Sequence, residues 1–175
     1  MSYNWNTRTE LLLGADRMGR LAHSHVLVVG LGGVGAYAAE QICRAGIGHM
    51  TIVDADTVNE SNINRQLPAL HSTLGMPKAE VVARRLLDIN PRLKLGVLNE
   101  FLRDERTEEV LSATRYDFVV DAIVSIRPKS FLFYHASQTN ITGVSSFGTG
   151  THIDPSRIQD EDSPSTRTGS LASTR

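Results

Sequence analysis

The stretch HVLVVGLGGVGAYAAEQICRAG, residues 25–46, decides the fold, because a strand, a turn and a helix follow one another in it. HVLVVG (25–30) is a short, β-branched apolar run that stops at glycine, as a buried parallel strand does. Small and apolar residues then recur at helical spacing over 33–45, and Gly46 is a residue that can end a helix. The stretch therefore predicts the first half of a βαβ unit.

The turn between this strand and this helix contains four glycines, Gly30, Gly32, Gly33 and Gly35. Three of them have the G-x-G-x-x-G spacing in the strand–turn–helix context that a nucleotide-binding loop requires. Backbone N–H groups can approach a phosphate where side chains are absent, and the helix N-terminus adds a partial positive charge. Asp54 ends the next predicted strand, where an acid commonly bonds ribose hydroxyls. A tight turn needed only for packing is the alternative, and the glycines alone do not identify the nucleotide.

Strand and helix patterns alternate along the rest of the chain. The sequence predicts strands at 49–56, 93–99, 116–122 and 141–147, and helices at 78–90, 104–114 and 128–138. This alternation predicts an α/β fold, with a doubly wound, mostly parallel Rossmann-like sheet and helices on both faces.

The composition is that of an ordinary globular protein. Of the 175 residues, 41% are hydrophobic and 21% are charged, and the formal net charge is -1, which argues against a uniformly basic nucleic-acid-binding surface. Cys43 is the one cysteine, which excludes an intramolecular disulfide and a cysteine metal cage. No signal peptide and no apolar run of transmembrane length is recognisable, so a cytoplasmic protein is expected.

Asp54 is followed by a polar segment that a plain dinucleotide-binding domain does not need. It contains Asn62, Asn64, Arg65 and Gln66, and Lys78 begins the next predicted helix. Arginine offers a planar fork to a phosphate, and lysine a compact positive charge. Together these groups could hold a triphosphate and stabilise charge at the α-phosphate during adenylyl transfer. A solvated loop with an ordinary helix start is the alternative for any one of them, and an NAD-dependent enzyme would leave them without a role.

The combination of these motifs resembles the ubiquitin-activating-enzyme-like adenylating family. The resemblance rests on GLGGVGAYAAEQICRAGIGHMTIVDADTVNESNINRQ (30–66) and GMPKAEVVARRLLDINP (75–91). It is strong over 8–122, fair over 123–159 and absent after that. It implies an N-terminal helical segment at 1–24, an ATP-binding adenylating domain at 25–150 and a disordered or truncated tail at 151–175.

The resemblance also implies a role for each matching residue. ATP would be bound by the glycine loop and the polar segment, namely Gly30, Gly32, Gly33, Gly35, Asp54, Asp56, Asn64, Arg65, Gln66 and Lys78. Within this set Asp54 would bind the ribose, while Arg65 and Lys78 would be catalytic because they neutralise the phosphates. Arg8 would be catalytic in a neighbouring subunit, which implies a homodimer. Asp121 matches the first acid of the family's D-x-x-D pair, and it would be catalytic and would hold Mg2+.

The reaction implied by the resemblance depends on ATP. The most similar branch of the family acts on tRNA carrying N6-threonylcarbamoyladenosine and removes water from that nucleoside. The carboxylate would be adenylated with release of pyrophosphate, and an internal nucleophile would then close a ring and expel AMP. Two alternatives stay open. One is an adenylyltransferase for a ubiquitin-like sulfur-carrier protein, with a sulfur-relay partner, although the zinc-binding cysteine pairs common in that branch are missing. The other is a non-catalytic nucleotide-binding member.

The sequence departs from the family pattern at two places. The D-x-x-D pair reads DAIV, so Val124 stands where the second acid would help to hold magnesium, and valine has no oxygen ligand. Asp121 or Asp56 would then have to compensate. Relatives also continue well beyond residue 175, whereas here the last residues are rich in Ser, Thr, Asp and Arg, a composition typical of disorder. Truncation, a frameshifted reading or a decayed copy would explain both departures.

Several further residues are weaker candidates. Cys43 is interpreted as a buried structural thiol, and the six histidines show no metal-ligand spacing. Basic residues that could contact tRNA phosphates are Arg84, Arg85, Arg92, Lys94, Arg127 and Lys129.

Overall fold

The computed structural model describes residues 5–139 and 141–146, and these form a five-stranded sheet in which every strand pairing is parallel. The order is β3-β2-β1-β4-β5. The strands are β1 (His25–Val29), β2 (His49–Val53), β3 (Lys94–Leu98), β4 (Phe118–Asp121) and β5 (Thr142–Ser145). The helices are α1 (Thr7–Leu13), α2 (Ala15–His23), α3 (Gly35–Ala45), α4 (Lys78–Ile89), α5 (Asp104–Ala113) and α6 (Ile126–Gln138). The doubly wound parallel sheet predicted from the alternating pattern is confirmed.

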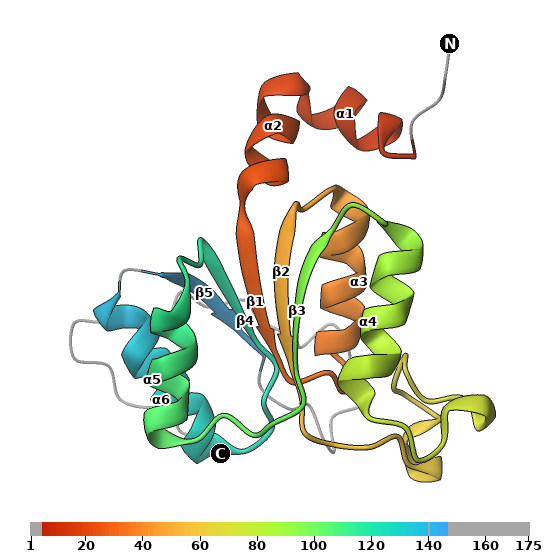
Figure 1. The fold of residues 1–175 in the computed structure, drawn as a ribbon, viewed down its shortest axis with the longest axis vertical. Coiled ribbons are helices and arrows are strands. Elements are labelled where there is room, and N and C mark those ends of the chain that lie inside the picture. The colour runs from red at the N-terminus through yellow and green to blue at the C-terminus, as the bar shows by residue number, and fades with distance from the viewer. Residues whose placement is uncertain (1–4, 140, 147–175) are drawn as a thin grey trace, which may run out of the picture.

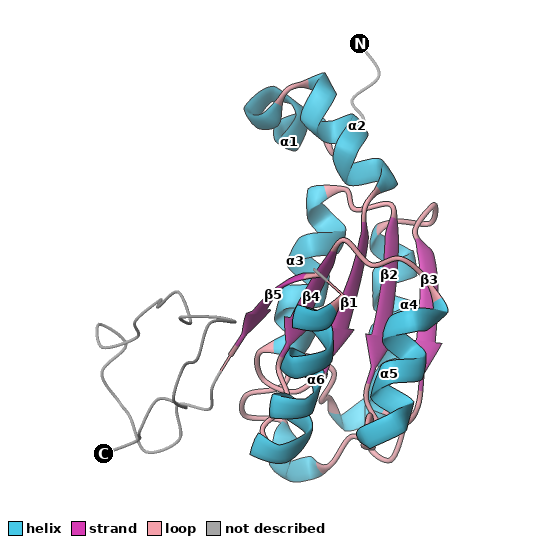
Figure 2. Ribbon diagram, turned by 90° about the vertical axis from the view of Figure 1, so that its left-hand side faces the viewer, coloured by secondary structure: helices cyan, strands magenta, loops and turns pink. Residues whose placement is uncertain are grey.

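Two helices cover each face of the sheet, so the protein has two apolar layers (Figures 1 and 2). Side chains alternate between the faces of a strand, and this separates Val26 and Val28 from Leu27 and Val29 in β1. Val26 and Val28 pack in the cluster formed with α3 and α4. Leu27 and Val29 pack in the cluster formed with α5 and α6. A strand buried on both faces requires the continuous apolar run that the sequence shows at 25–29.

The described part of the N-terminal segment contains two helices, α1 and α2. Gly14 separates α1 from α2 with a backbone φ of 80°. Neither helix contains a buried residue, and Leu11 and Leu12 are 80% and 81% exposed. Both helices lie beyond the end of the sheet where the strands begin (Figure 1). In the described part of the chain, no helix is long and apolar enough to cross a membrane.

Some boundaries differ from the sequence predictions for physical reasons. The helix predicted from Gly33 begins at Gly35, because Gly32 to Val34 form the turn. The strand predicted over 49–56 ends at Val53, because the backbone N–H of Asp56 turns back to the carboxylate of Asp54. Gly46 ends α3 in the left-handed conformation, as predicted. The predicted tail at 151–175 lies outside the described residues.

Candidate functional site

The strand order reverses between β1 and β4, and this is where a doubly wound sheet binds its ligand. After β1 the chain turns through the glycine loop towards α3 and β2, whereas β4 lies on the other side of β1. The two loops touch: a methyl group added at Gly30 would lie 2.7 Å from the carbonyl oxygen of Ala122. The carboxyl ends of β1 and β4 therefore form the floor of the candidate site.

The four glycines of the turn divide into two pairs. Gly30 has a φ of 89°, and a methyl group at Gly35 would lie 1.7 Å from the carbonyl oxygen of Gly30, so packing alone requires both glycines. Gly32 and Gly33 face the polar segment instead. A methyl group at Gly33 would lie 3.3 Å from the carbonyl oxygen of Arg65, and one at Gly32 would lie 3.7 Å from Nε2 of Gln66. Packing therefore explains Gly30 and Gly35. At Gly32 and Gly33, by contrast, the backbone is left open beside polar groups.

Asp54 links the glycine loop to the chain after β2. Its Oδ2 accepts a hydrogen bond of 2.6 Å from the backbone N–H of Leu31, and its Oδ1 accepts one of 2.8 Å from Asp56. Burial raises the pKa of this carboxyl, while the two backbone N–H groups and the charge of Lys78 oppose the rise. Each oxygen keeps a second lone pair that could accept a hydrogen bond from a ribose hydroxyl. The geometry therefore fits the ribose-binding role expected for Asp54.

Lys78 is buried at the start of α4 and is paired with Asp56. Its Nζ lies 2.9 Å from Oδ2 of Asp56, and its backbone N–H donates to the Asp56 carbonyl over 2.9 Å. The lysine side chain is 6% exposed, whereas that of Asp56 is 56% exposed. The ammonium is thus held at the carboxyl edge of the sheet, close enough to Asp54 to influence its pKa.

The polar segment folds against the glycine loop through two short 3-10 helices, η1 (Glu60–Asn62) and η2 (His71–Thr73). Asn62 is buried and caps η1, since its Oδ1 accepts from the backbone N–H of Asn59. Asn64 and Arg65 are exposed, and Nη1 of Arg65 donates to Oδ1 of Asn64 and to the carbonyl of Ser61. The side-chain oxygen of Gln66 is buried without a hydrogen-bond partner. Asn62 is therefore structural, while Asn64, Arg65 and Gln66 lie beside the loop.

Asp121, expected as a magnesium ligand, is wholly buried and paired with a lysine. Its Oδ2 accepts from Nζ of Lys129 at 2.7 Å and from Oγ of Ser145 at 2.8 Å, and its Oδ1 accepts from the backbone N–H of Ile123. Lys129 is 3% exposed, so it does not lie on the surface where a contact with tRNA was expected. Sequence reasoning missed this pair, although Lys129, Leu132 and Ala136 share a buried stripe at helical spacing.

These contacts do not fit a magnesium ion held by the protein at Asp121. Mg2+ requires accessible oxygen ligands, whereas Asp121 is wholly buried and its Oδ2 accepts from both the Lys129 ammonium and Oγ of Ser145. Val124 is 83% exposed and supplies no oxygen. Asp56, the other expected compensating acid, is paired with Lys78. Among residues 5–139 and 141–146, no group of three or more His, Cys, Asp or Glu side chains is placed to hold a metal ion.

Other candidates lie away from this edge or are otherwise engaged. Arg8 belongs to α1, at the end of the sheet opposite Lys78 (Figure 1), so it does not join the site of its own chain. Arg85 is paired with the buried Glu40. Lys94 begins β3 and so lies at the same end of the sheet as α1. Arg127 is exposed near the start of α6.

Cys43 is buried, and burial raises the pKa of its thiol to about 11, which agrees with a structural thiol.

Comparison with known proteins agrees with this geometry. The sequence matches the ThiF family over residues 3–174. It is 40% identical over 158 residues to the tRNA threonylcarbamoyladenosine dehydratase of Escherichia coli K12, which covers 89% of this chain and 59% of that protein. The dehydratase of Bacillus subtilis 168 is 38% identical over 166 residues, which covers 95% of this chain and 65% of that protein.

A solved structure of the E. coli dehydratase in complex with ATP superimposes with a TM-score of 0.85 at 39% identity, covering 88% of this chain and 63% of that one. This chain therefore spans roughly three-fifths of the length of the E. coli enzyme. With the matching family model, the parallel sheet and the glycine loop in agreement, the chain belongs to the ThiF family.

Proposed function

We propose that this chain binds ATP at the carboxyl edge of its sheet and adenylates a carboxylate, that of N6-threonylcarbamoyladenosine in tRNA. One observation carries the proposal: Leu31 of the glycine loop, Asp54, Asp56 and Lys78 form one continuous hydrogen-bonded chain at this edge. The glycine loop, the acid that we propose to bind ribose and the buried lysine are thereby held in fixed relation to each other. The ATP in the related E. coli structure supports the choice of nucleotide.

Each group has a chemical task in the proposed first step. The open backbone at Gly32 and Gly33, next to the N-terminus of α3, would receive the phosphates. Lys78 and Arg65 would neutralise charge that develops as the substrate carboxylate attacks the α-phosphorus and pyrophosphate leaves. To bind a phosphate, the ammonium group of Lys78 would have to leave its ion pair with Asp56, because the two pairings compete. No step is assigned to a metal ion held by Asp121.

The second step needs no nucleophile from the protein. An adenylated carboxylate is a mixed anhydride with a good leaving group, and a nucleophilic atom of the same modification can attack its carbonyl carbon. That attack closes the ring and expels AMP. The net change in the nucleoside is the loss of one water molecule. The protein's contribution would be to hold the two reacting groups in contact and to exclude bulk water.

We also propose that the active form is a homodimer in which Arg8 serves the partner's site. Its distance from the site of its own chain, together with the exposed Leu11 and Leu12 on the same helix, supports this assignment. Two leucines that are about four-fifths exposed on one short helix would gain free energy from burial against a second copy.

An adenylyltransferase for a ubiquitin-like sulfur carrier, with a sulfur-relay partner protein, is the second candidate function. It uses the same ATP site, and the absence of cysteine pairs from the sequence disfavours it. A nucleotide-binding member without activity is the third, and Val124 is the observation that favours it.

The test is incubation of purified protein with ATP, magnesium and tRNA carrying threonylcarbamoyladenosine, followed by digestion and mass spectrometry of the nucleosides. The proposal predicts AMP and a nucleoside that has lost one water molecule. Asp54→Asn should abolish both products, whereas Asp88→Asn, on the exposed surface of α4, should leave them unchanged. Transfer of AMP to an added carrier protein, with the tRNA unaltered, would establish the second candidate instead.

A further inference from the structure

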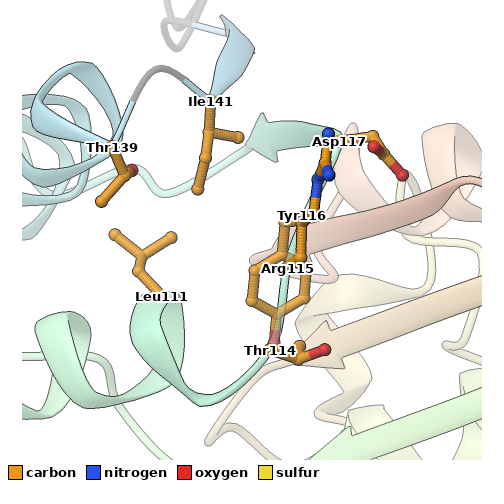
Figure 3. A pocket seen from close by; sticks show the side chains of 7 residues that line it. All are labelled: Leu111, Thr114, Arg115, Tyr116, Asp117, Thr139 and Ile141. Carbon is orange, nitrogen blue, oxygen red and sulfur yellow. The ribbon is translucent and has the colours of Figure 1, made fainter.

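Two adjoining pockets lie at the end of the sheet where the strands begin, opposite the ATP edge. The first, here called the histidine pocket, has a volume of about 370 Å3 and is lined by His23, His25, His49, Thr114, Arg115 and Asp117. The second has a volume of about 420 Å3 and shares the last three of these residues. Figure 3 shows the second pocket, where Leu111 and Ile141 point towards each other across an apolar side. None of the roles proposed for ATP uses these residues.

Arg115 forms a wall of both pockets and is exposed in the loop between α5 and β4. No residue of the described part of the chain forms an ion pair or hydrogen bond with its guanidinium group. Arg85 and Arg106, by contrast, are each paired with a glutamate. A guanidinium group that lines a pocket without a partner presents its fork of N–H donors to an oxyanion.

The histidines of the pocket differ in how far their rings are already engaged by other residues. Nδ1 of His23 lies 2.7 Å from the carbonyl oxygen of Gly19, which can only accept, so Nδ1 carries the proton and Nε2 is left for a ligand. His25 is engaged by Thr51 and packs on Tyr116, and burial is the main reason that its pKa is lowered. His49 lies beside it, with ring centroids 5.8 Å apart. Nε2 of His23 is therefore left for a ligand, whereas the ring of His25 is already engaged by Thr51.

Two further charged groups, Asp117 and Lys94, lie beside the histidines. Oδ2 of Asp117 accepts from the backbone N–H of His25, so part of its charge is already compensated. Lys94 lies next to His49 in the paired register of β3 and β2 and adds positive charge on that side. The guanidinium group of Arg115 and the ammonium group of Lys94 therefore outnumber the one carboxylate in the pocket lining.

We propose that the histidine pocket binds a phosphate group through Arg115, His23, His49 and the hydroxyl of Thr114. The phosphate belongs to the RNA backbone if the proposed tRNA reaction is correct, and to a free phosphate compound otherwise.

The test is NMR observation of the histidine rings in the full chain during titration with inorganic phosphate. The site predicts saturable shifts of the His23 and His49 ring signals near pH 6, and loss of these shifts in Arg115→Gln. Arg84→Gln, at an exposed position of α4, is the matched control and should retain them. Absence of saturable shifts, or shifts that persist in Arg115→Gln, would overturn the site.

A second measurement identifies the source of the phosphate. Affinity for tRNA should fall about tenfold in Arg115→Gln if the ligand is RNA, and it should stay unchanged in Arg17→Gln, at an exposed position of α2. Unchanged tRNA affinity in Arg115→Gln, with the phosphate shifts lost, would overturn the RNA source and leave a site for free phosphate. Because neither readout involves ATP turnover, failure of the phosphate site is distinguishable from failure of the adenylation proposal.

Discussion

Nζ of Lys129 lies 2.7 Å from Oδ2 of Asp121, and both side chains are buried beneath the carboxyl edge of the sheet. The pair joins β4 to α6, and the Lys129 ammonium also donates to Oγ of Ser145 and to the carbonyl of Ser146 after β5. Three elements on one side of the ATP edge are therefore held by a single ammonium group. This arrangement gives Asp121 a structural role in joining β4, β5 and α6, and the side chain of Val124, three residues later, is exposed.

Lys129→Met should destabilise the protein strongly, because it leaves the Asp121 carboxylate buried without a counter-charge. We expect the free energy of unfolding in urea to fall by about 3–5 kcal/mol. Lys94→Met, at an exposed position, should change it by less than about 0.5 kcal/mol. Adding Asp121→Asn to Lys129→Met should recover part of the loss. Equal free energies of unfolding for Lys129→Met and Lys94→Met would show that the buried pair contributes nothing to stability.

The two pairs of glycines should respond differently to alanine. Gly35→Ala places a methyl group against the carbonyl of Gly30 and should lower the free energy of unfolding by about 3 kcal/mol. Gly32→Ala meets only Nε2 of Gln66 at 3.7 Å, so stability should change little while ATP affinity, measured by calorimetry, falls about tenfold. Unchanged ATP affinity in Gly32→Ala would argue against phosphate contact at that turn.

Glu40 should make stability depend on acid pH. A hydrogen bond from Arg85 is the main cause that lowers the pKa of this carboxyl below its ordinary 4.5, and Arg44 assists. A lowered pKa contributes stability above the ordinary value, and that contribution is lost as the pH falls through the folded value. Glu40→Gln should therefore cost about 2 kcal/mol near pH 7, and less below about pH 4. Glu105→Gln, at an exposed position, is the control and should show no such dependence on pH. If the loss of unfolding free energy in Glu40→Gln did not vary with pH, the lowered pKa of Glu40 would be refuted.

Cys43 should be slow to react with thiol reagents in the folded protein. With its pKa raised to about 11 by burial, only about 0.1% of the thiol is thiolate near pH 8. The rate with Ellman's reagent should be at least about 100-fold lower in native protein than in urea. Similar rates in the two conditions would place the thiol at an accessible position.

Sequence patterns predicted the sheet because each strand has a distinct apolar run and the glycine turn occurs in an unmistakable context. They placed the glycine loop, Asp54 and Lys78 at one edge, because the carboxyl ends of parallel strands share that edge. They did not separate packing glycines from open ones, since that depends on how closely Ala122 approaches Gly30. Nor did they find the partner of Lys129, which is eight residues from Asp121 and reaches it only after α6 packs on the sheet.

The central claim, ATP-dependent adenylation at the carboxyl edge of the sheet, is tested most directly by ATP–pyrophosphate exchange. The measurement uses purified protein, magnesium and tRNA carrying threonylcarbamoyladenosine, with Val124→Asp alongside. The account predicts exchange that requires this tRNA, and a lower magnesium requirement in Val124→Asp, because the variant supplies an exposed oxygen ligand. ATP binding without exchange in either protein would contradict the claim and leave a nucleotide-binding member of the family without this activity.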